Sequence, residues 1–141
     1  MTTRQIFVNL PVEDLDSTVE FFTQLGFEFD PRFTDENATC MIIGDDSFVM
    51  LLDQPFFEGF IPDREIAGDG QTEVLVAISC GSRSAVDEMI EQAEAAGGHE
   101  YREAQDHGWM YARAFTDIDG HVWEAMHADE SQLPEEMAGG A

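Results

Sequence analysis

The chain has 141 residues, of which 43% are hydrophobic, and this size and composition are typical of one globular domain with its own core. It carries 30 acidic residues against 6 basic ones, all of them Arg, for a formal net charge of −24. Nucleic acids and anionic membranes attract Lys/Arg patches, so neither is expected as a partner. The many acidic side chains repel one another and destabilise the folded chain unless ions screen them. We therefore hypothesise a halophilic source.

No membrane span or targeting segment is apparent. The sequence has no run of about 18 apolar residues, and residues 1–12 lack the basic start and long apolar stretch of a signal peptide. We therefore expect a cytoplasmic protein. Cys40 and Cys80 each lie in an apolar, strand-like run, which favours buried free thiols over a disulfide or a metal pair.

The first half of the chain alternates between strand and helix signals. Residues 5–10 alternate as a strand does, and Asp14 can cap a helix with apolar side chains at helical spacing, which stops at Gly26. Three further strand candidates follow, at residues 27–33, 39–43 and 48–52. The order of elements is therefore βαβββ.

The second half repeats this order. A strand candidate at residues 72–79 precedes a helix that Ser82 or Ser84 can cap and that ends near residues 97–98. Three more strand candidates follow, at residues 99–103, 109–115 and 121–126. Recurrence of one supersecondary order predicts a duplicated α+β fold made of two βαβββ modules.

These elements make residues 1–127 a single domain. Its linker is unusual because it holds Phe56, Phe57 and Phe60, which either cover the mouth of a cavity or pack the linker onto a sheet. The predicted parts are module one at residues 5–53, the linker at 54–71, module two at 72–127 and a flexible acidic tail at 128–141.

A carboxylate stands out in the last strand candidate, where an Asp-Ile-Asp-Gly turn leads into the strand. Strand alternation puts Val122, Glu124 and Met126 on one face. If that face lines an enclosed space, Glu124 is an acid in apolar surroundings and needs a proton, a hydrogen-bond partner or a metal. The alternative is a solvated strand residue.

Three sequence patterns carry a resemblance to a known superfamily. Residues 12–27 read VEDLDSTVEFFTQLGF, residues 93–98 end a helix with Ala-Gly-Gly, and residues 115–124 read FTDIDGHVWE. In this order and spacing the chain, from Gln5 to His127, resembles the vicinal oxygen chelate superfamily of glyoxalase I, bleomycin-resistance proteins and extradiol dioxygenases. Residues 40–43, the Phe56-Phe57 pair and residues 105–108 resemble its group labelled "predicted lactoylglutathione lyase".

The resemblance implies a fold and a type of site. It implies mixed, curled sheets from the two modules enclosing a cavity, with the helices outside, and it also implies a homodimer. In metal-dependent members, one side chain from the first strand and one from the last strand of each module meet in the cavity. They hold a divalent metal, which acts as a Lewis acid on vicinal oxygens of the substrate.

Carried over to this chain, the four ligand positions fit a metal poorly. They fall on Phe7, Met50, Leu75 and Glu124, and only the last offers a suitable donor for a hard cation. A working site needs about three protein ligands. We therefore expect no cofactor and disfavour a divalent metal, and with it glyoxalase I or ring-cleaving dioxygenase activity of the metal-dependent type.

Other side chains could build a site without a metal. Tyr111 and Arg113 share one strand face and could converge with Glu124, so that Arg113 binds an acidic ligand group or pairs with Glu124. His107 could act as an acid or base at the rim, or lie in an exposed turn. The candidate binding residues are Phe7, Asn9, Met50, Phe57, Phe60, Leu75, Ser79, Tyr111, Arg113 and Met126.

Two functions remain open at this point. The first is a protein that binds a small oxygenated or aromatic molecule in the cavity without a catalytic metal, which the apolar ligand positions and the Phe-rich linker favour. The second is a lyase or isomerase, resembling a lactoylglutathione lyase, that uses Glu124 as base with His107 or Arg113 assisting. Only the second gives Glu124 a catalytic role.

Overall fold

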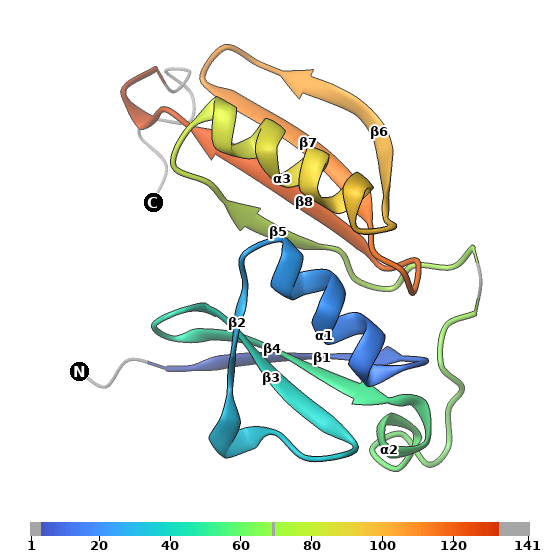
Figure 1. The fold of residues 1–141 in the computed structure, drawn as a ribbon. Coiled ribbons are helices and arrows are strands. Elements are labelled where there is room, and N and C mark those ends of the chain that lie inside the picture. Colours follow the sequence, from blue (N-terminus) through green and yellow to red (C-terminus); the bar gives the residue numbers. More distant parts are fainter. Residues whose placement is uncertain (1–3, 69, 133–141) are drawn as a thin grey trace. The chain divides into compact units, whose positions relative to one another are not determined.

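The computed structural model describes residues 4–68 and 70–132, and the chain divides between Gln71 and Thr72 into two compact units. We call these units module one and module two. Each contains one four-stranded mixed sheet and a long helix (Figure 1). The predicted α+β fold of two βαβββ modules is therefore confirmed.

Module one forms the sheet β1-β4-β3-β2, in which β1 and β4 are parallel and the other neighbours antiparallel. The side chain of Asp14 caps α1 as predicted, because it accepts the backbone N–H groups of Asp16 and Ser17. The elements are β1 (Ile6–Val12), α1 (Leu15–Gln24), β2 (Glu28–Asp30), the 3-10 helix η1 (Pro31–Phe33), β3 (Ala38–Gly44), β4 (Ser47–Asp53) and α2 (Gln54–Glu58).

The core of module one lies between α1 and one face of its sheet. Thr18 is fully buried there, although it lies off the apolar stripe expected of this helix, because its hydroxyl donates to the carbonyl of Asp14 at 3.1 Å. Each large apolar side chain withdrawn from water stabilises the fold by about 1.5–3 kcal/mol. Those buried here are Leu10, Val12, Phe21, Phe22, Met41, Val49 and Leu51.

Module two repeats this arrangement as the sheet β5-β8-β7-β6, again with one parallel pair, β5 and β8. Ser82 caps its helix by accepting the N–H of Ala85. The first strand begins at Val76, later than the predicted residue 72. The elements are β5 (Val76–Ser79), α3 (Arg83–Ala95), β6 (His99–Asp106), β7 (Met110–Thr116), β8 (Val122–Ala128) and the 3-10 helix η2 (Glu130–Gln132).

The C-terminal region and the two cysteines were also the subject of predictions. β8 continues to Ala128 and η2 follows it, so the region predicted as a tail is structured to Gln132, and its residues 133–141 lie outside the described part. Cys40 is buried and Cys80 half-buried, both as free thiols whose pKa values burial raises. No helix among the described residues is long and apolar enough to cross a membrane.

Candidate functional site

The sheet of module two has two different faces. Tyr111 and Arg113 of β7 bond to Asp87 of α3, so the alternate residues Ala112 and Ala114 lie on the opposite face. The strand register extends that face over all four strands, and no helix described in module two packs on it. We call it the helix-free face; the residues at its centre are Ala77, Ser79, Arg102, Gln105, Ala112, Ala114, Glu124 and Met126.

An ion pair occupies the middle of the helix-free face. Arg102 on β6 and Glu124 on β8 both register with Ala114 on the strand between them. Because Ala114 presents only a methyl group, the two long side chains meet across it, and Nη2 of Arg102 donates to Oε2 of Glu124 at 2.5 Å. Their side chains are only 28% and 17% exposed, so much of this pair is withdrawn from water.

Most of the hydrogen-bonding capacity of this pair is unused. A guanidinium has five N–H donors, and within residues 4–68 and 70–132 Arg102 uses one of them, towards Glu124. Oε1 of Glu124 likewise has no partner among these residues. Every fully buried side-chain N or O atom in the described chain is hydrogen-bonded, so these unpaired atoms remain open to solvent and to a ligand.

The face under α3 holds a separate polar network. Asp87 accepts from the Tyr111 hydroxyl at 2.7 Å and from Arg113 at 2.8 Å, while Glu100 accepts two bonds from Arg113 at 2.9 Å. The bonds from Tyr111 and Arg113 lower the pKa of Asp87, and the bond from Tyr111 has the larger effect. Burial lowers the pKa of Arg113, but the bonds to Asp87 and Glu100 outweigh it and raise that pKa above its usual range.

This network overturns the expected convergence of Tyr111, Arg113 and Glu124. Tyr111 and Arg113 point to α3, whereas Glu124 lies on the other face of the sheet and pairs with Arg102. Of the other predicted residues in module two, Ser79 and Met126 share the face of Glu124. His107 lies in the exposed turn between β6 and β7, and Leu75 precedes β5 with 49% exposure.

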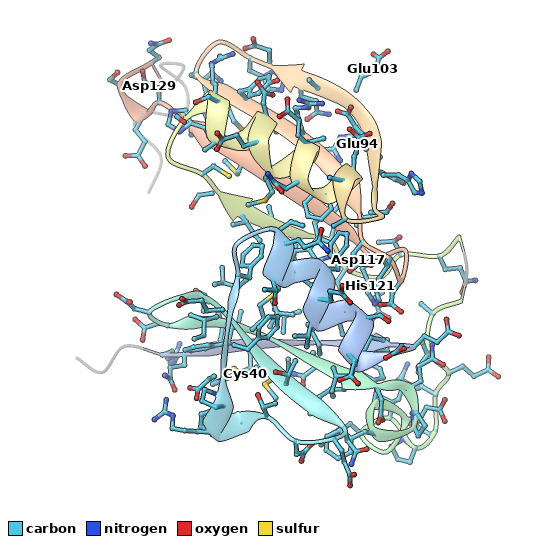
Figure 2. The ribbon with its side chains drawn as sticks, in the orientation of Figure 1. Cys40, Glu94, Glu103, Asp117, His121 and Asp129 are labelled. Atoms are coloured by element: carbon cyan, nitrogen blue, oxygen red, sulfur yellow. The ribbon has the colours of Figure 1, made fainter. Side chains whose placement is uncertain are left out.

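The turn before β8 places Glu124. Asp117 is 3% exposed, and its Oδ1 accepts the backbone N–H groups of Asp119 and His121 at 2.9 and 3.0 Å. Its Oδ2 accepts Nε1 of Trp123 at 2.9 Å. Asp117 and His121 lie together at this turn (Figure 2). Burial raises the pKa of Asp117, while His121 and the accepted hydrogen bonds oppose the rise.

In module one, Phe7, Asn9 and Met50 lie on the sheet face opposite that of Leu10 and Val49. Phe7 stacks on Phe48 with ring centroids 4.9 Å apart and planes at 16°, and Asn9 registers beside Met50. Asn9 donates its side-chain N–H to the carbonyl of Phe7 at 3.2 Å.

The linker phenylalanines are placed by α2. Phe57 lies in this helix and is half-buried, whereas Phe60 follows it and is 65% exposed. Phe60 meets the ring of Phe56 edge-on, with the centroids 5.3 Å apart.

A concave feature of about 370 Å³ lies beside the start of α3 and is lined by residues that include Arg83, Trp109 and His127. Arg83 already bonds to both carboxylate oxygens of Asp106 and to the carbonyl of Gly108. Nδ1 of His127 lies 3.0 Å from the carbonyl of Cys80. The polar groups of this hollow are therefore largely engaged within the protein.

Comparison with known proteins agrees with this architecture. Residues 4–44 match the family model described as bleomycin resistance protein-like N-terminal. A glyoxalase/bleomycin resistance protein/dioxygenase family enzyme from Burkholderia phytofirmans PsJN has 17% identity and a TM-score of 0.76, covering 89% of this chain and 99% of its own. The fold is that of the vicinal oxygen chelate superfamily.

Two further solved structures extend this likeness to the superfamily fold. A hypothetical protein from S. aureus has 23% identity and a TM-score of 0.75, over 91% of this chain and 96% of its own. The fosfomycin resistance protein FosX from Mesorhizobium loti has 14% identity and a TM-score of 0.65, over 91% and 94%. A search of curated sequences finds no match. At these identities the likeness concerns the fold.

The donor set in this chain does not fit the divalent metal of the superfamily's metal-dependent members. Phe7 and Leu75 offer no donor atom and Met50 offers a thioether, a poor ligand for hard cations. Glu124, the remaining position, is already bonded to a guanidinium. No three His, Cys, Asp or Glu side chains in the part of the chain that the structure describes form a group that could hold a metal ion.

Reasoning from sequence missed several residues of the helix-free face: Arg102, Gln105 and the alanines Ala77, Ala112 and Ala114. The register of β6 shifts between Glu100 and Arg102 and again before Gln105, so simple alternation fails along this strand. One signal was available: Arg102 is one of only six cations in a chain with 30 acidic residues, so the placement of each Arg is informative.

Proposed function

We propose that this chain binds a small oxygenated or aromatic molecule on the helix-free face of module two, without a catalytic metal. The observation that carries the proposal is the partly water-shielded pair of Arg102 and Glu124, whose other donors and Oε1 have no partner among the described residues. Small-molecule sites typically place a few oriented polar groups among apolar side chains, and on this face Arg102 and Glu124 lie among alanines and Met126.

Module one presents an apolar surface of its own. It consists of the stacked rings of Phe7 and Phe48 together with Met50, and aromatic molecules favour such a surface. The fold itself serves more than one role among its solved members, since one is described as an enzyme and another as a fosfomycin resistance protein. Fold alone therefore does not decide between binding and catalysis.

One observation favours a second candidate, a lyase or isomerase in which Glu124 is the base. Its Oε1 has no partner among the described residues and is open to solvent, so it could take a proton from a bound substrate. Arg102 would then hold the other carboxylate oxygen and keep the base oriented. His107 lies in the turn after β6, and an assisting role for it stays a prediction.

A Glu124→Gln variant separates the two candidates. Small aromatic and oxygenated compounds are titrated into the ¹⁵N-labelled full chain, and backbone amide shifts around Ala77, Ala114 and Met126 report binding on the helix-free face. A binding protein keeps its fold in E124Q, binds about two- to tenfold more weakly because one hydrogen bond is weakened, and turns over no compound in either form. Turnover that E124Q abolishes supports the enzyme instead.

The control is Arg83→Gln, which breaks an exposed ion pair with Asp106 away from this face and leaves the shifts unchanged. If no compound shifts amides on the helix-free face at millimolar concentration, the proposal fails. Metal analysis of protein purified without chelators completes the test, since about one tightly held Ni, Zn or Fe per chain contradicts the metal-free proposal.

A further inference from the structure

We propose that the ligand of this face is a neutral, planar molecule that presents a hydrogen-bond acceptor next to a donor, as an amide or a hydroxycarbonyl group does. The inference rests on the proposed function and adds the chemical class of the ligand. Within residues 4–68 and 70–132, Arg102 has N–H donors without a partner and Glu124 has an Oε1 without one, and the bond between the two side chains holds these groups next to each other.

The paired charges argue against an ionic ligand. A carboxylate that reaches Arg102 also approaches Glu124, since Nη2 and Oε2 of the two side chains are only 2.5 Å apart. A cation that reaches Glu124 meets Arg102 in the same way. Like charges in a partly buried site repel strongly. For either ion, the repulsion from one side chain therefore offsets the attraction to the other.

A neutral ligand with both kinds of group satisfies both side chains at once. Its acceptor takes an N–H of Arg102, and its donor gives a hydrogen bond to Oε1 of Glu124. Both bonds involve an ionised partner and are therefore stronger than bonds between neutral groups. The ion pair stays intact, so no buried charge is left unpaired.

The floor of the site favours a flat ligand. Ala77 on β5 and Ala112 and Ala114 on β7, the two strands on either side of β8, carry only methyl groups on the helix-free face. Met126 and Gln105 flank Ala112 in the row next to the ion pair. These short side chains leave the ion pair without bulky neighbours in its own row, so a ring can lie beside the pair with its polar edge towards it, and a flexible thioether such as Met126 adapts to its outline.

Three probes of nearly equal shape test the inference: 2-naphthamide, 2-naphthoate and 2-naphthamidinium. They are titrated into the full chain at 1 M KCl, where the Debye length is about 3 Å, so the net charge of −24 no longer decides which ion approaches. We expect the amide to bind about tenfold more tightly than either ion, as expected for one hydrogen bond to a charged group gained without repulsion.

Single variants should then reverse the preference in opposite directions. In Glu124→Gln the repulsion of anions is removed, so the naphthoate becomes the tightest of the three. In Arg102→Gln the repulsion of cations is removed, so the naphthamidinium becomes the tightest of the three probes. The double variant R102Q/E124Q carries no unpaired charge at this site and loses discrimination, which keeps the test valid if either single variant folds poorly. Arg83→Gln keeps the amide preference.

Different failures remain distinguishable. If all three probes shift the amides of the helix-free face with equal affinity, or if an ion binds best to the parent chain, the ligand class is wrong while the proposed binding function stands. If E124Q and R102Q leave the order of the probes unchanged, the ion pair does not select the ligand and the inference is overturned. If no probe reaches this face, both the inference and the proposed function fall.

Discussion

Asp117 shows how one residue sets the position of the site. It is 3% exposed and uses both carboxylate oxygens, accepting three N–H groups from the turn and from the indole of Trp123. The turn that Asp117 closes leads directly into β8, where Glu124 is the residue after Trp123. A carboxylate buried at a turn thus fixes which residues of β8 face the helix-free side.

Asp117→Asn removes this arrangement at nearly constant volume. An amide has one acceptor oxygen, so its NH₂ group must face either the indole N–H or the two backbone N–H groups, and one or more buried donors lose their partner. We expect a loss of about 1–3 kcal/mol in the free energy of unfolding. Urea unfolding at pH 7 measures it, with the exposed turn variant Asp45→Asn as control. Equal stability of D117N and the parent chain would contradict this role.

Single residues also show where reasoning from sequence succeeds and where it fails. Asp14 and Ser82 were predictable caps because the chemistry of a cap is local. The partner of Glu124 was not predictable. Glu100 bonds to Arg113 under α3 while Arg102, two residues later, pairs with Glu124 on the other face, and only the irregular register of β6 makes this possible.

At the scale of elements, an ion pair and a hydrogen bond hold α3 on its sheet in addition to apolar packing. Val86 and Ile90 are fully buried, and Asp87 between them bonds to both Tyr111 and Arg113 of β7. The pKa of Asp87 is lowered, first by Tyr111 and then by Arg113. A folded-state pKa below the unfolded value means that this contribution is present at neutral pH and is lost in acid.

Asp87→Asn tests this link through its pH dependence. At pH 7 we expect a loss of about 1–2 kcal/mol, since Asp87 is partly exposed and solvent weakens its bonds. The difference from the parent chain should shrink as pH falls below about 3.9, the ordinary pKa of an Asp carboxyl, because the parent then protonates Asp87 as well. Urea unfolding from pH 7 to 3 measures it, with Glu91→Gln on the exposed side of α3 as control. A difference that stays constant over this range would contradict the link.

The order of elements was predictable because hydrophobic periodicity and caps are local signals, whereas their ends depended on pairing. Val74 and Leu75 read as strand residues, yet they are 45% and 49% exposed and the pairing with β8 starts only at Val76. α2 was missed inside the Phe-rich linker, although Asp53 caps it and Pro55 stands in its first turn.

Over the whole molecule, the few cations are used locally. Arg32, Arg83, Arg102 and Arg113 each pair with at least one carboxylate, which leaves a large surplus of acidic groups. Glu94 on α3 and Glu103 on β6 are exposed examples of that surplus (Figure 2). Such groups repel one another at low ionic strength and oppose folding.

We therefore predict that the melting temperature rises with KCl concentration between 0.1 and about 2 M, as the hypothesis of a halophilic source requires. A gain of about 2 kcal/mol in stability corresponds to a rise of about 4–8 °C at this chain length. Calorimetry at several KCl concentrations measures it. The double variant E94Q/E103Q changes the net charge from −24 to −22 without touching a described ion pair. If repulsion is the cause, this variant melts above the parent chain at 0.1 M KCl and together with it at 1 M, because screening removes the advantage of the lower charge. A melting temperature independent of KCl would refute the hypothesis.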